Sequence, residues 1–294
     1  MNRHPAFGVL LAAFGALVLT PDAMLMRLSQ MDGFQMAAWR GLFMGSVMVL
    51  AWVLISRTRA RDLAVLRTPA GLALVGCQFF NSMLFSLGIA LAPAAVVLFG
   101  VAAVPVFAAL LSWLLLGEVT RPATWVAIAA VFGGIGIAVL GGEADGLVLD
   151  ARALIGALFG LGVALMLAMN FVMLRARPQL PILLVIGCGA WAAGLTGTVI
   201  TGLDAMGNGQ VWAMAVTGAV VLPVSFFALS SAARYTHAAN VSLLMLLETV
   251  LGPLWVWAGV GERPTMMMAL GGAIVVVSLA VYLLITGRRT GPRT

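Results

Sequence analysis

Residues 86–118 read SLGIALAPAAVVLFGVAAVPVFAALLSWLLLGE, and residues 230–262 read SSAARYTHAANVSLLMLLETVLGPLWVWAGVGE. The two stretches align without a gap, and both end in W-x-x-x-G-E, at Glu118 and Glu262. Other identical pairs are Ser86 and Ser230, Ala94 and Ala238, Ala95 and Ala239, Val106 and Val250, Leu110 and Leu254, and Trp113 and Trp257. Self-similarity at a fixed shift is typical of an internal repeat. It predicts two similar halves, residues 1–146 and 147–294.

The composition indicates a membrane protein. Of the 294 residues, 63% are hydrophobic and only 9% are charged, and lysine is absent. A soluble protein of this length could not cover its surface with so few charges, whereas lipid accepts apolar side chains on every face of a helix. Long continuous apolar runs, without alternation, favour helices over a β-barrel.

Ten apolar segments are long enough to cross a bilayer core of about 30 Å as helices. They cover residues 7–26, 34–55, 70–91, 95–116, 123–141, 153–174, 182–202, 210–230, 239–260 and 265–286. Each half therefore holds five spans, and an odd number forces the second half to enter the membrane upside down. The predicted fold is an all-α membrane protein of ten transmembrane helices, arranged as two inverted five-helix repeats around a central cavity.

Arginine placement predicts the orientation through the positive-inside rule. With the N-terminus inside, the cytoplasmic segments hold Arg3, Arg57, Arg59, Arg61, Arg67, Arg121, Arg175, Arg177, Arg234, Arg288, Arg289 and Arg293. The opposite side holds only Arg27, Arg152 and Arg263. We expect a multi-pass protein of the bacterial cytoplasmic membrane with both termini cytoplasmic. The first span is expected to be retained rather than cleaved as a signal peptide, because Thr20, Pro21 and Asp22 interrupt its apolar run.

The net charge of +6 is thus explained by topology, and we expect no nucleic-acid partner. Cys77 and Cys188 fall inside spans and are interpreted as packing residues, while His4 and His237 are weak ligand candidates. No metal or other cofactor is expected.

The two five-span halves, and the W-x-x-x-G-E that closes the fourth and ninth spans, resemble the EamA-like branch of the drug/metabolite transporter superfamily. The family often carries a Glu-Pro pair before that ending, whereas this chain has Val104-Pro105 in the first half and Glu248-Thr249 in the second. Within the branch the sequence is similar to bacterial exporters of aromatic amino acids of the YddG type.

The resemblance implies a secondary transporter that exports small metabolites, most simply aromatic and other apolar amino acids, by alternating access. A drug or nucleoside-like metabolite exporter and a small-molecule channel are the alternatives. The sequence lacks the paired aspartates or H-E-x-x-H of an intramembrane hydrolase and any nucleotide-binding loop, so an enzyme and direct ATP coupling are not expected. The expected partners are an amino-acid substrate and the lipid bilayer, with the chain a monomer or a weak homo-oligomer.

Glu248 is an acid in the middle of the ninth span. A charge at that depth costs roughly 2.5–3.5 kcal/mol on insertion scales, so Glu248 should face the bundle interior or be neutralised. Asn240, Leu244 and Glu248 share a helix face at i, i+4 spacing. Either Glu248 contacts the substrate amine or carries a proton, or it is a structural acid bonded to a neighbouring helix.

Four prolines remove the backbone hydrogen bond to the carbonyl four residues earlier: Pro21, Pro105, Pro223 and Pro253. A freed carbonyl within the membrane must be buried or line a wet cavity. These prolines are either kinks that take part in gating and binding, or prolines that helix packing tolerates.

Two spans carry polar stripes. Gln78, Asn81, Ser82 and Phe85 recur at helical spacing in span three. Span six carries Met166, Met169, Asn170 and Met173 in the same way. Such faces should point inward, and adaptable Met with stacking Phe99 and Phe226 would suit an aromatic substrate, although ordinary packing gives similar stripes.

Arg40 is the candidate membrane-embedded cation. It either extends to the outer interface or binds an anionic group or a glutamate. The spacings Gly41-x-x-x-Gly45 and Gly156-x-x-x-Gly160 predict close helix approach, within the chain or between chains.

Overall fold

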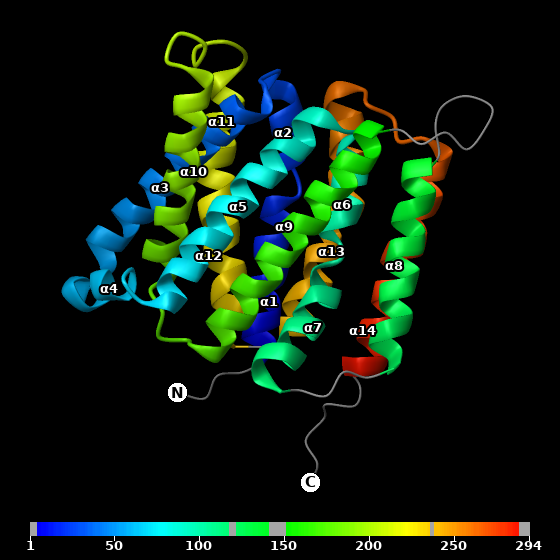
Figure 1. Ribbon diagram of the computed structural model, residues 1–294, viewed down its shortest axis with the longest axis horizontal. Coiled ribbons are helices and arrows are strands. Elements are labelled where there is room, and N and C mark those ends of the chain that lie inside the picture. The colour runs from blue at the N-terminus through cyan, green and yellow to red at the C-terminus, as the bar shows by residue number, and fades with distance from the viewer. Residues whose placement is uncertain (1–4, 118–121, 141–150, 236–237, 288–294) are drawn as a thin grey trace.

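The computed structural model describes residues 5–117, 122–140, 151–235 and 238–287, and every regular element in them is a helix. The helices form one bundle in which α1 begins and α14 finishes at the same end (Figure 1). We call this the termini end and the opposite one the far end. Glu118, His4 and His237 lie outside the described residues.

The helices follow the ten predicted spans. Seven of these spans are each one continuous helix: α3 Gly33–Ile55, α5 Pro69–Leu91, α8 Pro122–Leu140, α9 Ala151–Ala176, α10 Ile182–Thr201, α13 Ala238–Val260 and α14 Met266–Gly287. The first, fourth and eighth spans are composite: α1 Pro5–Leu19 with α2 Asp22–Ser29, α6 Ala94–Val101 with α7 Val104–Leu116, and α11 Val211–Val216, η1 Thr217–Val221 and α12 Leu222–Ala232. A short helix, α4 Arg59–Val65, lies between the second and third spans.

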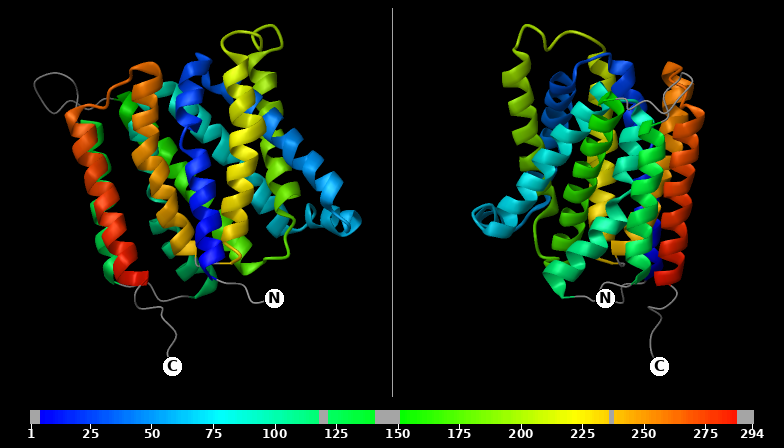
Figure 2. Two further views of the ribbon diagram at one scale, coloured as in Figure 1. Left: turned by 180° about the vertical axis from the view of Figure 1, so that it is seen from behind. Right: turned by 45° about the vertical axis from the view of Figure 1, so that its right-hand side comes forward.

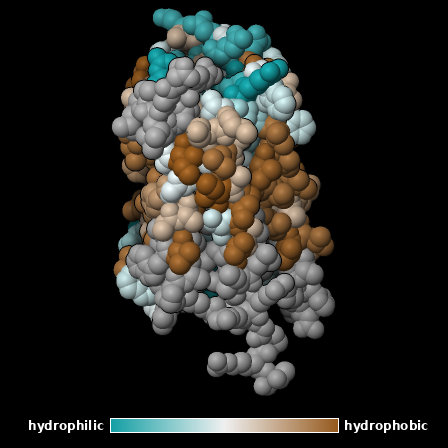
Figure 3. Space-filling view, turned by 90° about the vertical axis from the view of Figure 1, so that its right-hand side faces the viewer, coloured by the Kyte–Doolittle hydropathy of each residue, from teal (hydrophilic) through white to brown (hydrophobic). Residues whose placement is uncertain are grey.

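The described part of the chain has the dimensions and surface of a multi-pass membrane protein. Seven helical segments are long and apolar enough to cross a bilayer, and α13 and α14 contribute shorter apolar stretches. Many large apolar side chains are exposed on the outside of the bundle, including Leu54, Val199 and Leu203. Figure 3 shows such side chains as a brown band below a hydrophilic end. An exposed apolar surface of this extent requires lipid.

Local sequence signals set the helix starts. The Asp32 side chain accepts hydrogen bonds from the backbone N–H groups of Phe34 and Gln35 and so caps α3. Thr68 caps α5 by accepting from the N–H of Gly71, and Pro69 follows at the first helical turn, where a missing N–H costs nothing.

Three of the four prolines stand at interruptions of the regular α-helix. Thr20 and Pro21 separate α1 from α2, and Pro105 lies in the first turn of α7, just after a break at Ala102 and Ala103. Pro223 lies in the first turn of α12, immediately after the π-helical turn η1. The helix α13 continues through Pro253.

Glycines allow a close and extensive crossing between α3 and α10. A Cβ atom on Gly41 would lie 2.4 Å from the backbone nitrogen of Gly194, and one on Gly45 would lie 2.2 Å from a ring carbon of Trp191. A Cβ atom on Gly156 would likewise lie 2.2 Å from the Ala92 side chain, and one on Gly160 would lie 2.3 Å from the Val97 carbonyl oxygen. Both glycine spacings therefore pack helices within the chain.

At one edge of the bundle α8 and α14 lie side by side (Figure 2). At the far end, Arg27 of α2 forms an ion pair with Glu262, with 3.0 Å between Arg27 Nε and Glu262 Oε2. Arg27 Nη2 also donates to the Ala92 carbonyl oxygen at 2.6 Å, and the Ala94 N–H donates to Glu262 Oε1 at 2.9 Å. We call these contacts the far-end latch, because they join α2 to the α5–α6 and α13–α14 connections.

Candidate functional site

A cavity lies in the middle of the bundle, lined by side chains from both halves of the sequence. Its volume is about 30 Å³. Its lining residues are Leu19, Asp22, Arg40, Gln78, Asn81, Ser82, Phe85, Val101, Val163, Leu167, Leu222, Phe226, Met245 and Glu248. A mostly apolar wall with a few convergent polar groups is typical of small-molecule sites.

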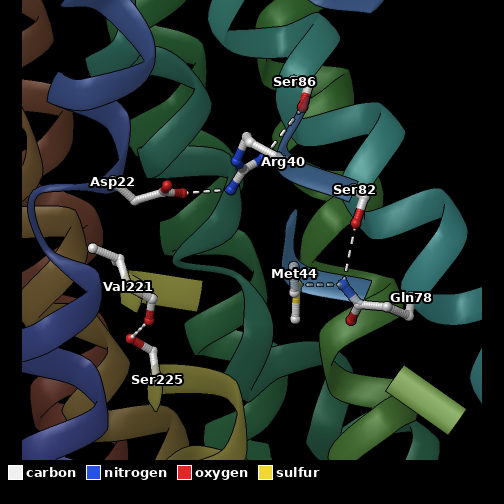
Figure 4. A network of polar contacts seen from close by, with 8 residues as sticks. All are labelled: Asp22, Arg40, Met44, Gln78, Ser82, Ser86, Val221 and Ser225. Atoms are coloured by element: carbon white, nitrogen blue, oxygen red, sulfur yellow. Dashed lines mark hydrogen bonds and ion pairs between the residues drawn. The ribbon is translucent and has the colours of Figure 1, made fainter. Parts of the chain in front are cut away.

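An ion pair forms one side of the cavity. Asp22 is the first residue of α2, directly after the break at Pro21, and its Oδ2 lies 2.5 Å from Nη2 of Arg40 on α3 (Figure 4). Arg40 Nη1 donates to the Ser86 hydroxyl at 3.2 Å, and its guanidinium carbon lies 5.2 Å from the centre of the Phe85 ring. A cation this deeply buried needs such partners, since lipid and apolar side chains cannot solvate it.

A second polar group comes from α5. Gln78 Nε2 donates to the Ser82 hydroxyl at 3.1 Å and approaches Met44 Sδ at 3.9 Å (Figure 4). Gln78 Oε1, Arg40 Nε and Asp22 Oδ1 are buried without a hydrogen-bond partner among the described residues. The cavity therefore presents both donor and acceptor atoms that this part of the protein leaves unused.

Glu248 lines the same cavity from α13, and only 4% of its surface is exposed. Within the described residues no side chain or backbone group donates a hydrogen bond to its carboxylate. A buried carboxylate without a donor is costly when ionised. It is suited to bind a proton or a cationic group that enters the cavity.

The structure brings together half of the substrate-binding residues predicted from the sequence. Gln78, Asn81, Ser82, Phe85, Phe226 and Glu248 all line the cavity. Five others are not part of this lining: Phe99, Met166, Met169, Asn170 and Leu244. The side chain of the remaining one, Asn240, lies outside the described residues.

Helix rotation explains one of these displacements. On α9 the residues that reach the cavity are Val163 and Leu167. Met169, two residues after Leu167, points to the other side of the helix because successive residues are rotated by about 100°. Phe99 points toward α14 instead, where its ring occupies the space that a Cβ on Gly272 would fill, at 2.2 Å.

Arg40 does not extend to a membrane interface, so that alternative is wrong. Its side chain is buried and its partner is an aspartate. Asp22 was not predicted as a site residue, although an acid beside a proline break in a span, together with a lone embedded arginine, is a signal for such a pair. Leu19, Val101, Val163, Leu167, Leu222 and Met245 are apolar lining residues that no sequence pattern distinguished.

The first half of the chain matches a known family. The sequence profile of the EamA-like transporter family matches residues 6–140. A solved structure described only as "Crystal structure of protein" shares 20% sequence identity at a TM-score of 0.68, and the alignment covers 98% of this chain and 99% of that chain. This likeness shows a common fold over nearly the whole length. No curated protein sequence shows significant similarity to the chain.

Proposed function

We propose that the protein is a secondary transporter that exports small amphiphilic metabolites, amino acids with apolar or aromatic side chains above all, across the bacterial cytoplasmic membrane. The family match supports a membrane transporter of small metabolites. The observation that carries the substrate class is the central cavity, which combines a buried guanidinium, two buried carboxyl groups and an apolar wall.

An apolar amino acid has the chemical groups that such a cavity can bind. Its carboxylate complements Arg40, which keeps an unused Nε donor within the described part of the chain, and its ammonium group complements Glu248. Phe85 and Phe226 offer faces for an aromatic side chain. Charge-assisted hydrogen bonds of this kind contribute about 1.5–3 kcal/mol each.

The pattern of helix packing supports two inverted repeats. In the second half, α9 corresponds to α1 and α12 corresponds to α5. Helix α5 packs on α9, and in the same way α12 packs on α1. Helix α3 packs on α10, and these are the second spans of the two halves; α8 packs on α14, and these are the fifth spans of the two halves. α1 rises from the termini end while α9 runs toward it (Figure 1), as an inverted second half requires.

Alternating access fits this architecture, because two similar halves in opposite orientation can give two shapes of similar energy around one site. The central cavity takes lining residues from both halves. With a volume of only about 30 Å³, the cavity must widen before an amino acid enters.

Counterflow in proteoliposomes tests the proposal. The vesicles contain unlabelled phenylalanine, tryptophan, methionine or threonine, and labelled substrate is added outside. A carrier accumulates label transiently, whereas a channel only equilibrates it. Accumulation with at least one of these amino acids supports the proposal, and its absence with all four excludes amino-acid transport. Nucleosides and hydrophobic drugs, tested in parallel, identify the alternative exporter.

A second experiment tests the inverted topology. Single cysteines introduced after Trp113 and after Trp257 are labelled in intact cells with a membrane-impermeant maleimide. The inverted arrangement requires that only the position after Trp257 reacts. Labelling of both positions from the same side contradicts the two-repeat proposal and, with it, this form of alternating access.

A further inference from the structure

A second, larger cavity lies toward the termini end, between α4, the last turns of α3 and α12, and the start of α10. Its volume is about 350 Å³. Its lining includes Trp52, Asp62, Leu180, Phe227, Ser231 and Arg234. The space is large enough for a small metabolite.

Asp62 supplies a negative charge to this cavity. Its carboxylate accepts hydrogen bonds from the Ser56 hydroxyl at 2.6 Å, the Trp52 indole N–H at 2.9 Å and the Thr58 hydroxyl at 3.2 Å. Burial raises the pKa of Asp62, but these hydrogen bonds and the charge of Arg61 together lower it below the ordinary value. The group is therefore anionic at neutral pH, and the donors fix its position.

Arg234 supplies a positive charge from another element, the turn that follows α12. Its Nη2 donates to the Leu180 carbonyl oxygen at 2.5 Å, which anchors the guanidinium beside the start of α10. The guanidinium can serve more than one acceptor, because it carries five N–H donors. One cavity thus presents an anion and a cation from separate elements.

Apolar side chains form the rest of the wall. Trp52 is 8% exposed and gives a fixed aromatic face, and Phe227, which also lines the cavity, is 46% exposed. Leu180 and Ile182 are buried lining residues. The chemistry matches a molecule with an ammonium group, an anionic group and an apolar body.

A stripe on α3 connects this cavity with the central one. Arg40, Met44, Met48 and Trp52 follow each other at i, i+4 spacing, and all four are buried. Arg40 lines the central cavity and Trp52 the second one, so Met44 and Met48 lie between them. Methionine is the most adaptable apolar side chain, which suits a partition that must open.

We propose that the second cavity is a loading site, in which Asp62 binds the ammonium group and Arg234 the carboxylate of an apolar amino acid before it passes Met44 and Met48. This inference rests on the proposed function of amino-acid transport. The ammonium and phosphate groups of phosphatidylethanolamine have the same chemistry, so the experiment must separate a free amino acid from a lipid.

Protection of a cysteine measures occupancy of this cavity. Ser231→Cys is introduced into full-length protein in which Cys77 and Cys188 are replaced by Ala, and the protein is reconstituted in nanodiscs of phosphatidylglycerol. Phenylalanine at about ten times its Kd should slow maleimide labelling about tenfold, because only the unoccupied fraction reacts. Ala176→Cys, at the exposed end of α9, should react at an unchanged rate. Equal rates with and without phenylalanine at position 231 overturn the proposal.

Analogues test the charge pairing. Phenethylamine lacks the carboxylate and 3-phenylpropionate lacks the ammonium, so each should need at least about tenfold higher concentration for the same protection. Equal protection by all three compounds means a merely apolar cavity and overturns the proposal. If phosphatidylethanolamine in the nanodiscs protects the cysteine and phenylalanine does not, the cavity is a lipid site, and this result also overturns the proposal.

Two variants separate charge from structure at Asp62. Asp62→Asn removes the charge, whereas Ser56→Ala removes one of the donors and leaves the charge. Asp62→Asn should weaken phenylalanine protection much more than Ser56→Ala does; equal weakening by both indicates a structural role and contradicts the proposal.

The Glu248→Gln background tests independence from the central cavity. Protection of position 231 should persist there, and its loss means that no separate site exists. Wild-type counterflow without protection refutes only the loading site, whereas protection without counterflow refutes only the transport proposal.

Discussion

Asp22 and Arg40 form an ion pair whose closest atoms are 2.5 Å apart and whose side chains are 1% and 6% exposed. The pair joins the start of α2 to the middle of α3, at the wall of the cavity that Glu248 also lines. A buried pair repays the cost of removing two charges from water only while both partners are present. The half-helix α2 is thereby tied to the wall of the central cavity.

Removing one partner of this pair should destabilise the protein more than removing both. Asp22→Asn or Arg40→Met leaves an uncompensated buried group and should cost about 3–5 kcal/mol, whereas the double variant should recover a large part of this loss. Urea unfolding in detergent, arranged as a double-mutant cycle, measures the coupling. Additive effects of the two changes would show that the pair contributes no coupling energy.

Glu248→Gln should weaken substrate affinity without unfolding the protein, because no described group donates a hydrogen bond to this carboxylate. The loss of one charge-assisted contact to the ammonium group, about 1.5–3 kcal/mol, corresponds to roughly 10- to 150-fold in KM for counterflow. Glu248→Asp is the matched control, since it keeps the charge and should retain more affinity. Uptake across imposed proton gradients is the second readout, and an unchanged proton dependence in Glu248→Gln removes this residue from coupling.

The far-end latch should govern opening on that side. Arg27 and Glu262 are partly exposed, at 24% and 31% of their side-chain surfaces, so Glu262→Gln should cost no more than about 1 kcal/mol, or about a fivefold shift in the population of open molecules. Ala95→Cys, buried next to the latch, should then react faster with a maleimide. If Ala95→Cys reacts at the same rate with and without Glu262→Gln, the latch has no gating role.

The crossing of α3 and α10 should tolerate no side chain at Gly41. A Cβ there would lie 2.4 Å from backbone, so Gly41→Ala must separate the helices and should lower the melting temperature. Gly76→Ala is the matched control in α5, since nothing lies within 4 Å of the position that a Cβ atom on Gly76 would take. That variant should be neutral or stabilising by up to about 1 kcal/mol, because alanine favours the helix. Similar melting temperatures for both variants would refute the close crossing.

Acid should loosen α4. The pKa of Asp62 lies below its ordinary value, so its hydrogen bonds to Ser56, Trp52 and Thr58 add stability above the unfolded pKa. That contribution is lost as the pH falls through the lowered pKa. Amide hydrogen exchange in residues 59–65, corrected for the intrinsic chemical exchange rate at each pH, should therefore accelerate on acidification. In Asp62→Asn the corrected exchange rate should not depend on pH over the same range. A pH effect that survives in this variant would assign it to another group.

The sequence determined the membrane class and the helices, because burial in lipid demands long apolar stretches whose backbone groups are satisfied within each helix. It also indicated the breaks near Pro21, Pro105 and Pro223, since proline cannot donate to the preceding turn. The polar stripe of Gln78, Asn81 and Ser82 was readable for the same reason: amides avoid lipid, and their helical spacing puts them on one face.

Only the tertiary structure decided which of the inward faces meet. Met169 and Phe99 have side chains as suitable for a substrate as those of Met245 and Phe226, yet helix rotation and the space beside Gly272 turn them elsewhere. The partner of Arg40 is 18 residues away on another helix, and the cavity of Asp62 and Arg234 joins segments from opposite halves of the chain. Such contacts depend on the rotation and crossing of whole helices, which the periodicity of a single segment does not contain.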